Sequence, residues 1–209
     1  MAITSYATLK TAIEAWLKRS DSTTTGEIDT FIDLFEAEVN RNVRHREMEQ
    51  RVTTTANSEY VSLPADFLEM RSIKLNSNPN RQIRFESPQN FTALRATNTT
   101  QTNEPNFYTI VGKQIRFSPI PSSDSVEMNY FEKITPLDST NTTNWLINDY
   151  PDAYLYGSLY HGCLFVRNNE LLSTVAPSYK LAMQELDLSD NRARWGATPL
   201  VIRTAAMIA

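Results

Sequence analysis

Residues 107–117, FYTIVGKQIRF, contain the clearest secondary-structure signal of the chain. Two runs rich in β-branched and aromatic residues flank Gly112 and Lys113. A two-residue hairpin turn of this kind needs a positive φ at its first central position, which glycine adopts at little cost. Pro119 and Pro121 follow the second run and end its strand. The stretch therefore predicts an antiparallel β-hairpin.

The two-residue period of the hairpin extends to both sides of it, from residue 51 to residue 135. Short runs of β-branched and aromatic residues are separated there by Pro, Asn and Gly, and residues 87–95 favour a short helix. The middle of the chain is therefore expected to be rich in β-structure. We expect strands at 52–55, 60–63, 71–75, 82–85, 107–111, 114–117 and 126–132.

The N-terminal part has a helical period instead. An apolar residue at every third or fourth position predicts a helix over residues 6–19, which residues 21–26 end. A second helix is expected from residue 27 to about residue 49, with a single apolar stripe. Its acidic first turns and basic last turns complement the helix dipole, so these charges need no functional explanation.

Helical spacing returns after the polar linker 137–144. One helix is expected over residues 151–167 and a longer one over residues 169–194. Pro177 lies inside the longer helix, where it removes a backbone hydrogen bond and clashes with the preceding turn. We therefore expect the last helix to be kinked or split at Pro177.

The composition indicates a folded chain of 209 residues with a net charge of −4. This length can bury a substantial core in one domain, or in one domain with an insertion. We therefore expect an α+β fold, with a helical bundle from the N- and C-terminal helices, a β-rich insertion and an extended C-terminal arm. The expected segments are 1–50 (N-terminal helices of the bundle), 51–136 (β-rich insertion), 137–195 (C-terminal helices of the bundle) and 196–209 (arm).

Catalytic and metal-binding patterns are weak in this sequence. His45 and His161 each lack a partner at the i+3 or i+4 position that would place two ligands on one helix face. His161 and Cys163 would point about 200° apart on a helix. Residues 157–162 have the glycine spacing of a phosphate-binding loop, but Cys163 and Leu164 follow where Lys and Ser or Thr are required. We expect no metal, no cofactor and no enzymatic activity.

Charge and hydropathy disfavour further functional classes. A net charge of −4 gives no global reason to bind nucleic acid. No apolar stretch approaches the roughly 20 residues that span a bilayer. Residues 1–20 carry Glu14 within an amphipathic pattern, which is unlike a signal peptide. The single cysteine, Cys163, cannot form an internal disulfide and agrees with synthesis in a reducing cytoplasm.

Four tyrosines are concentrated in and just before the helix expected at 151–167. Tyr150 with Tyr154, and Tyr156 with Tyr160, form two i, i+4 pairs on different sides of that helix. One side can belong to the core and the other can be exposed. Core packing, or a subunit interface where amphipathic rings are useful, explains the four residues without a ligand.

The end of the chain has an unusual charge pattern. After Asp190 it carries three arginines and no acidic side chain. Pro199 and the β-branched residues after it favour an extended backbone. The segment is either a strand added to the subunit's own surface or an arm that docks on another protein. The candidate arm residues are Arg192, Arg194, Trp195, Pro199, Leu200, Val201, Ile202, Arg203 and Ile208.

Five sequence stretches are informative through their order and spacing. They are 6–17 (YATLKTAIEAWL), 44–49 (RHREME), 63–69 (LPADFLE), 104–121 (EPNFYTIVGKQIRFSPIP) and 144–159 (NWLINDYPDAYLYGSL). Together they resemble the head-to-tail adaptor proteins of tailed bacteriophages, also called head-completion or connector proteins, particularly those of short-tailed phages. The resemblance covers nearly the whole chain.

The resemblance implies a structural virion protein that assembles as a ring, a dodecamer, beneath the portal protein at the head-tail junction. The C-terminal arm would insert into the portal, the four tyrosines would lie at the ring interface, and the β-rich insertion would face tail or nozzle proteins. The genomic DNA would pass through the bore without sequence recognition. The protein would be made in the host cytoplasm and would have no membrane partner.

Two alternative functions stay open. One is a tail-associated peptidoglycan hydrolase, whose only support is acidic residues such as Glu14 or Glu69. The other is a different tail-tube or stopper component. A peptidoglycan-clearing assay tests the first alternative, and the position of labelled subunits in partly assembled particles tests the second.

Overall fold

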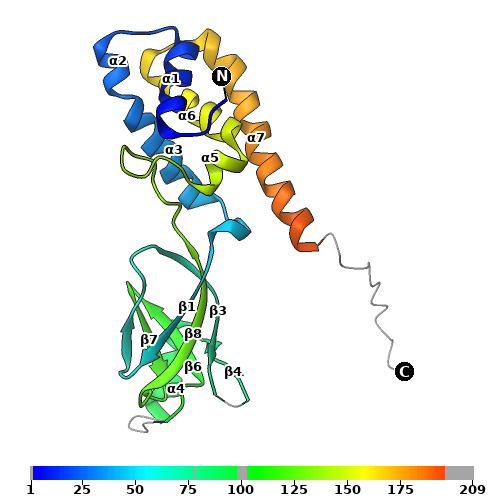
Figure 1. The fold of residues 1–209 in the computed structure, drawn as a ribbon. Helices are drawn as coiled ribbons and strands as arrows, with labels where there is room; N and C mark the ends of the chain where they lie inside the picture. Colours follow the sequence, from blue (N-terminus) through cyan, green and yellow to red (C-terminus); the bar gives the residue numbers. More distant parts are fainter. Residues whose placement is uncertain (1, 78, 98–102, 196–209) are drawn as a thin grey trace. The chain divides into compact units, whose positions relative to one another are not determined.

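The computed structural model describes residues 2–77, 79–97 and 103–195 and divides into two compact units (Figure 1). The helical unit combines segments from both ends of the described chain, and the β unit is formed by the segment between them. The described residues contain seven α-helices and two β-sheets. The predicted α+β class is therefore confirmed.

The helical unit consists of residues up to Arg46 and from Thr135 onward. Its first helix begins with a capping box, in which the side chains of Ser5 and Thr8 each accept a hydrogen bond from the other's backbone N–H. The helices of this unit are α1 (Tyr6–Leu17), α2 (Ser22–Gly26), α3 (Ile28–Asn42), α5 (Trp145–Asp149), α6 (Pro151–Val166) and α7 (Asn169–Trp195).

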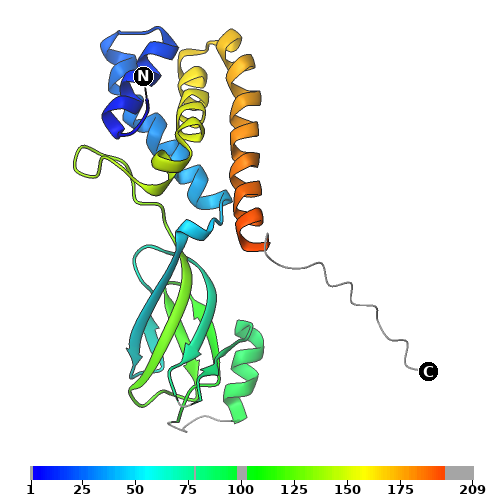
Figure 2. The same ribbon diagram turned by 45° about the vertical axis from the view of Figure 1, so that its right-hand side comes forward.

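Helix α6 is the centre of the helical unit. It contacts α1, α3, α5 and α7, and Figure 2 shows it between the N-terminal helices and α7. A β-carbon at Gly157 would lie 2.1 Å from Cδ2 of Phe35, which is far inside van der Waals contact. Helices α3 and α6 therefore approach each other this closely because residue 157 is a glycine.

Helix α3 is shorter than predicted. It ends at Asn42 rather than near residue 49, because Val43 has an extended backbone with φ −99° and ψ 138°. A short 3₁₀ turn, Arg46–Met48, follows, and Glu49 already pairs with Phe131 in a sheet. The charged residues at 44–49 favour a helix by sequence, but in the structure they form a short 3₁₀ turn and the start of a strand.

The long helix α7 is continuous across Pro177 and is not split there. Pro177 is exposed, as is Ser173, whose carbonyl loses its helical hydrogen bond. That carbonyl lies on the solvated side of the helix, where water can replace the missing donor. The cost of an interior proline is therefore reduced at this position.

The β unit is Glu47–Ile134. It contains two four-stranded sheets, with the strand orders β1-β8-β3-β4 and β2-β7-β6-β5. Its elements are β1 (Glu49–Ala56), β2 (Tyr60–Ser62), β3 (Phe67–Leu75), β4 (Arg81–Gln82), β5 (Arg84–Phe85), α4 (Pro88–Thr97), β6 (Phe107–Val111), β7 (Gln114–Ser118) and β8 (Asp124–Glu132).

Both sheets of the β unit contribute to one apolar core. Cross-strand neighbours such as Ile73 and Met128 face inward in the first sheet, and Ile115 and Phe117 do so in the second. The hydroxyl of buried Tyr130 donates a hydrogen bond to Asp66 at 3.2 Å, and burial, with the nearby carboxylate, raises the pKa of Tyr130 to about 12. The inward positions alternate along the strands, as the two-residue period predicts.

The predicted hairpin is confirmed. Val111 pairs with Gln114 across the two-residue turn, and Gly112 has a φ of 61°. The predicted strand at 82–85 is wrong as a single strand. Buried Ile83 separates β4 from β5, and these two strands pair in different sheets. Two-residue strands on either side of a corner leave too short a pattern to be recognised.

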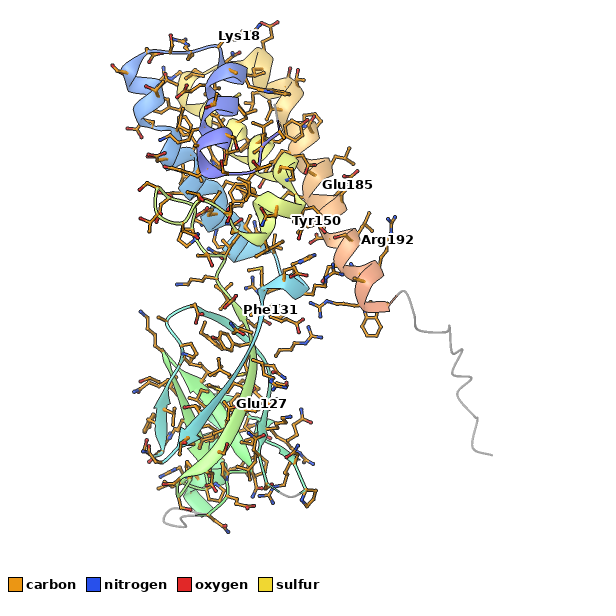
Figure 3. The ribbon with its side chains drawn as sticks, in the orientation of Figure 1. Lys18, Glu127, Phe131, Tyr150, Glu185 and Arg192 are labelled. Carbon is orange, nitrogen blue, oxygen red and sulfur yellow. The ribbon has the colours of Figure 1, made fainter. Side chains whose placement is uncertain are left out.

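The outer face of the β1-β8-β3 sheet is polar. Glu127 of β8, labelled in Figure 3, lies between Thr53 of β1 and Lys74 of β3. Its carboxylate is 3.0 Å from the Lys74 ammonium and 4.0 Å from the Arg51 guanidinium. These cations compensate for the nearly complete burial of Glu127, so the charge is structural.

Candidate functional site

The C-terminal turns of α7 are held to the helical unit by one carboxylate. Asp190 accepts the Arg46 backbone N–H at 2.9 Å with one oxygen and the Arg194 Nε–H at 2.5 Å with the other. Burial alone would raise the pKa of Asp190, but the hydrogen bonds from Arg194 and Arg46 outweigh it and the pKa is lowered. The last turns of α7 are therefore fixed to the segment that follows α3.

This arrangement separates the predicted arm residues into three groups. Arg194 is engaged by Asp190 within the subunit. Arg192, labelled in Figure 3, is exposed, and Trp195 is 66% exposed at the end of α7. The remaining arm residues lie outside the described residues: Pro199, Leu200, Val201, Ile202, Arg203 and Ile208.

Helix α7 also carries an exposed apolar stripe that sequence reasoning missed. Leu181, Leu188 and Trp195 are seven residues apart, about two helical turns, and so lie on one face. They are 56%, 52% and 66% exposed, whereas Ala182 and Leu186 face the bundle. The seven-residue spacing of these residues is visible in the sequence. Core-facing residues of a helix have the same spacing, so it does not by itself identify an exposed stripe. Exposed polar residues such as Glu185 and Arg192 separate them on this face, so the three side chains are separate apolar anchors that another protein can contact.

The four tyrosines of the predicted interface all make contacts within the subunit. Tyr154 is fully buried and is a core residue. Tyr150 hydrogen-bonds to Ser189 of α7 through its hydroxyl. Tyr156 packs edge-on against Trp16 of α1, and Tyr160 packs against Tyr179 of α7. Only Tyr150, Tyr156 and Tyr160 keep partial exposure.

A buried polar cluster joins α3, α6 and the linker before α5. The Tyr154 hydroxyl donates to the Glu36 carboxylate at 2.8 Å, and the Leu137 N–H donates to the same oxygen at 2.9 Å. Asn144 donates to the Tyr154 hydroxyl at 2.6 Å. Burial raises the pKa of Glu36 to about 7, against the opposing effect of its two hydrogen bonds. The cluster fixes the linker where the chain returns to the helical unit.

The two histidines and the cysteine have separate surroundings in the described structure. His45 stacks on Trp145 with ring centroids 4.9 Å apart, and His161 lies 3.4 Å from Glu38. Burial raises the pKa of Cys163, which disfavours its reactive thiolate. Within the ranges that the structure describes, no group of three His, Cys, Asp or Glu residues could hold a metal ion.

The family model described as SU10 adaptor protein matches residues 4–203, nearly the whole chain and both of its units. The chain belongs to the SU10 adaptor protein family. Comparison with curated proteins gives no match.

Family membership confirms the predicted class: the adaptor is a structural protein of bacteriophages that acts between head and tail, and the family is not one of enzymes. Such an adaptor interacts with portal and tail components in the virion. Glu14 and Glu69, which motivated the hydrolase alternative, lie in different units. Among the described helices of the adaptor, none has the length and hydropathy to cross a membrane.

The buried cluster gives the adaptor a predicted pH dependence. Glu36 is 4% exposed and binds its proton more tightly in the folded state, with a pKa of about 7 against 4.5. Its contribution to stability is therefore complete below about pH 4.5 and is lost as the pH rises to 7, by on the order of 3 kcal/mol. We expect Glu36→Gln to remove this part of the pH dependence.

Tryptophan fluorescence during urea unfolding measures this effect, because Trp16, Trp145 and Trp195 all belong to the helical unit. The difference in unfolding midpoint between the parent and Glu36→Gln should change between pH 5 and pH 8. A difference that stays constant over this range would show that Glu36 does not titrate as described.

Proposed function

We propose that the adaptor forms a closed ring, a dodecamer, that joins the portal to the tail of a short-tailed phage and continues the DNA channel. The family match over residues 4–203 is the observation that carries the proposal, since it assigns both units to a head-tail adaptor. The net charge of −4 agrees with a channel through which DNA passes without tight binding.

The helical unit supplies the ring wall in this proposal. The exposed stripe of Leu181, Leu188 and Trp195 supports a contact between neighbouring copies, because a ring needs an apolar surface that the isolated subunit leaves uncovered. Tyr156 and Tyr160 keep enough exposure to add to this contact. Tyr154 contributes indirectly, by holding α6 in place from the core.

The C-terminal arm, residues 196–209, docks on the portal in this proposal. Its support is the sequence pattern of the arm and the position of its starting point. The hydrogen bond from the Arg46 N–H to Asp190 fixes the last turns of α7, and Arg192 and Trp195 are exposed beside it. A fixed starting point lowers the conformational entropy that the arm loses on docking.

Assembly in vitro tests the proposed function. Heads produced without the adaptor should fail to join purified tails, and addition of the adaptor should restore infectious particles. Restoration should require binding to the head before the tail is added. Tails that join such heads without the adaptor, or an adaptor that clears peptidoglycan but does not bind heads, would contradict the proposal.

A further inference from the structure

The β unit contains a cavity of about 990 Å³ that the assembly surfaces above do not use. One wall is the first part of β3, with Phe67, Leu68 and Met70. The opposite wall is the end of the β6–β7 hairpin, with Ile110 and Val111. All these residues belong to the β unit, so the cavity is complete within it.

The sheet topology explains why this cavity exists. Strand β4 pairs only with Lys74 and Leu75 of β3, and β5 pairs only with Phe107 and Tyr108 of β6. In the described part of the chain, β3 also pairs with β8 and β6 also pairs with β7, each along the edge opposite the short strand. The two short strands thus end early and leave an open slot between β3 and β6. An uncovered strand edge is a template for pairing with another chain.

The side chains around the slot define the chemistry of its occupant. The walls are mostly apolar, and Val111 is 48% exposed. Lys113 and Lys133 are exposed in the lining and form no ion pair within the described residues. Glu69, the acidic residue of the lining, already has an interaction partner in the subunit. The slot is therefore mostly apolar, and its lining carries two lysines against one glutamate.

We infer that this slot receives an extended segment of a tail component, which adds a strand to the free edge of β3. The inference rests on the proposed function for the presence of a tail partner. The segment has apolar side chains at alternate positions, which fill the slot, and carboxylates that meet Lys113 and Lys133. The uncovered part of β3, residues 67–72, matches a segment of roughly six residues, about 20 Å long.

Charge distinguishes this occupant from the adaptor's own C-terminal arm. Residues 196–209 contain Arg203 and no acidic side chain, so in the slot they would place like charges beside Lys113 and Lys133. A partner segment that carries Asp or Glu instead forms attractive pairs there. The experiment must distinguish binding of a tail segment from binding of the C-terminal arm of another copy.

Photo-crosslinking in assembled particles identifies the occupant. A benzoylphenylalanine replaces Val111 in the full-length adaptor, which is then assembled on heads and joined to purified tails. The matched control carries the same group at Thr53, on the polar outer face of the other sheet. We expect position 111, but not position 53, to crosslink to a tail component, within a segment that contains apolar residues and carboxylates. Crosslinks from position 111 to another copy or to the portal, or none, overturn the inference.

Charge reversal provides a second readout. Lys113→Glu combined with Lys133→Glu should reduce tail joining at least tenfold, while head binding stays within twofold of the parent. Arg84→Glu, an exposed charge reversal in the same unit but outside the slot, should leave both within twofold. Unchanged tail joining by the double variant overturns the inference and leaves the proposed function intact. Failure of the parent adaptor to bind heads would instead contradict the proposed function, and also the inference that rests on it.

Discussion

An adaptor that lacks residues 199–209 is expected to keep both folded units and to lose portal binding. Every described element ends at or before Trp195, and Asp190 holds the end of α7 from within the helical unit. The removed segment contains Leu200, Val201 and Ile202, the apolar part of the proposed arm. Because a few apolar anchors dominate most interfaces, we expect the affinity for the portal to fall by at least about a hundredfold.

Circular dichroism and a portal-binding titration measure the two parts of this prediction. A full-length control, Val201→Asp with Ile202→Asp, keeps the length of the arm but removes its apolar character. It should lose binding to a similar extent. Undiminished portal binding by the shortened chain would assign the portal contact to another surface, such as the stripe of Leu181, Leu188 and Trp195.

Gly157→Ala is expected to destabilise the helical unit by about 3 kcal/mol, the upper end for overpacked cores. The added β-carbon would lie 2.1 Å from Cδ2 and 2.4 Å from Cε2 of Phe35. The Phe35 ring cannot move away, since it is fully buried and packs edge-on against Tyr154 with centroids 5.1 Å apart. Helices α3 and α6 must therefore separate to admit the methyl group.

Gly26→Ala is the matched control for this change. No atom lies within 4 Å of a β-carbon at Gly26, so its effect should stay within about 0.5 kcal/mol. Urea unfolding followed by tryptophan fluorescence compares the two variants. Equal stability of both would mean that the close approach of α3 and α6 is not required in solution.

Local sequence patterns are sufficient to predict the structure where a residue's conformation depends on its near neighbours. Gly112 predicts the hairpin because a two-residue turn requires a positive φ at this position. The end of α3 was not predictable in the same way. Residues 44–49 carry good helix-forming side chains, but contacts with residues distant in sequence hold them outside the helix, including the hydrogen bond from the Arg46 N–H to Asp190 and the pairing of Glu49 with Phe131. Pro177 does not split α7, because the solvated side of the helix lowers its cost.

The candidate surfaces likewise combine features that the local sequence predicts with features that depend on distant contacts. The charge pattern after Asp190 and the i, i+4 spacing of Asp190 and Arg194 are visible in the sequence, but the hydrogen bond from the Arg46 N–H to Asp190 depends on how α7 packs beside the segment after α3. Buried Tyr154 likewise hydrogen-bonds to Glu36, which is distant in sequence. The slot in the β unit arises where β4 and β5 end, and its position follows from strand register rather than from any motif.

Imaging of the purified adaptor mixed with its portal tests the central claim most directly. The account predicts a closed ring of adaptor copies, coaxial with the portal, in which each C-terminal arm contacts the portal and each α7 stripe contacts a neighbouring copy. Portal rings that remain without added density at saturating adaptor, together with adaptor found only on isolated tails, would contradict it.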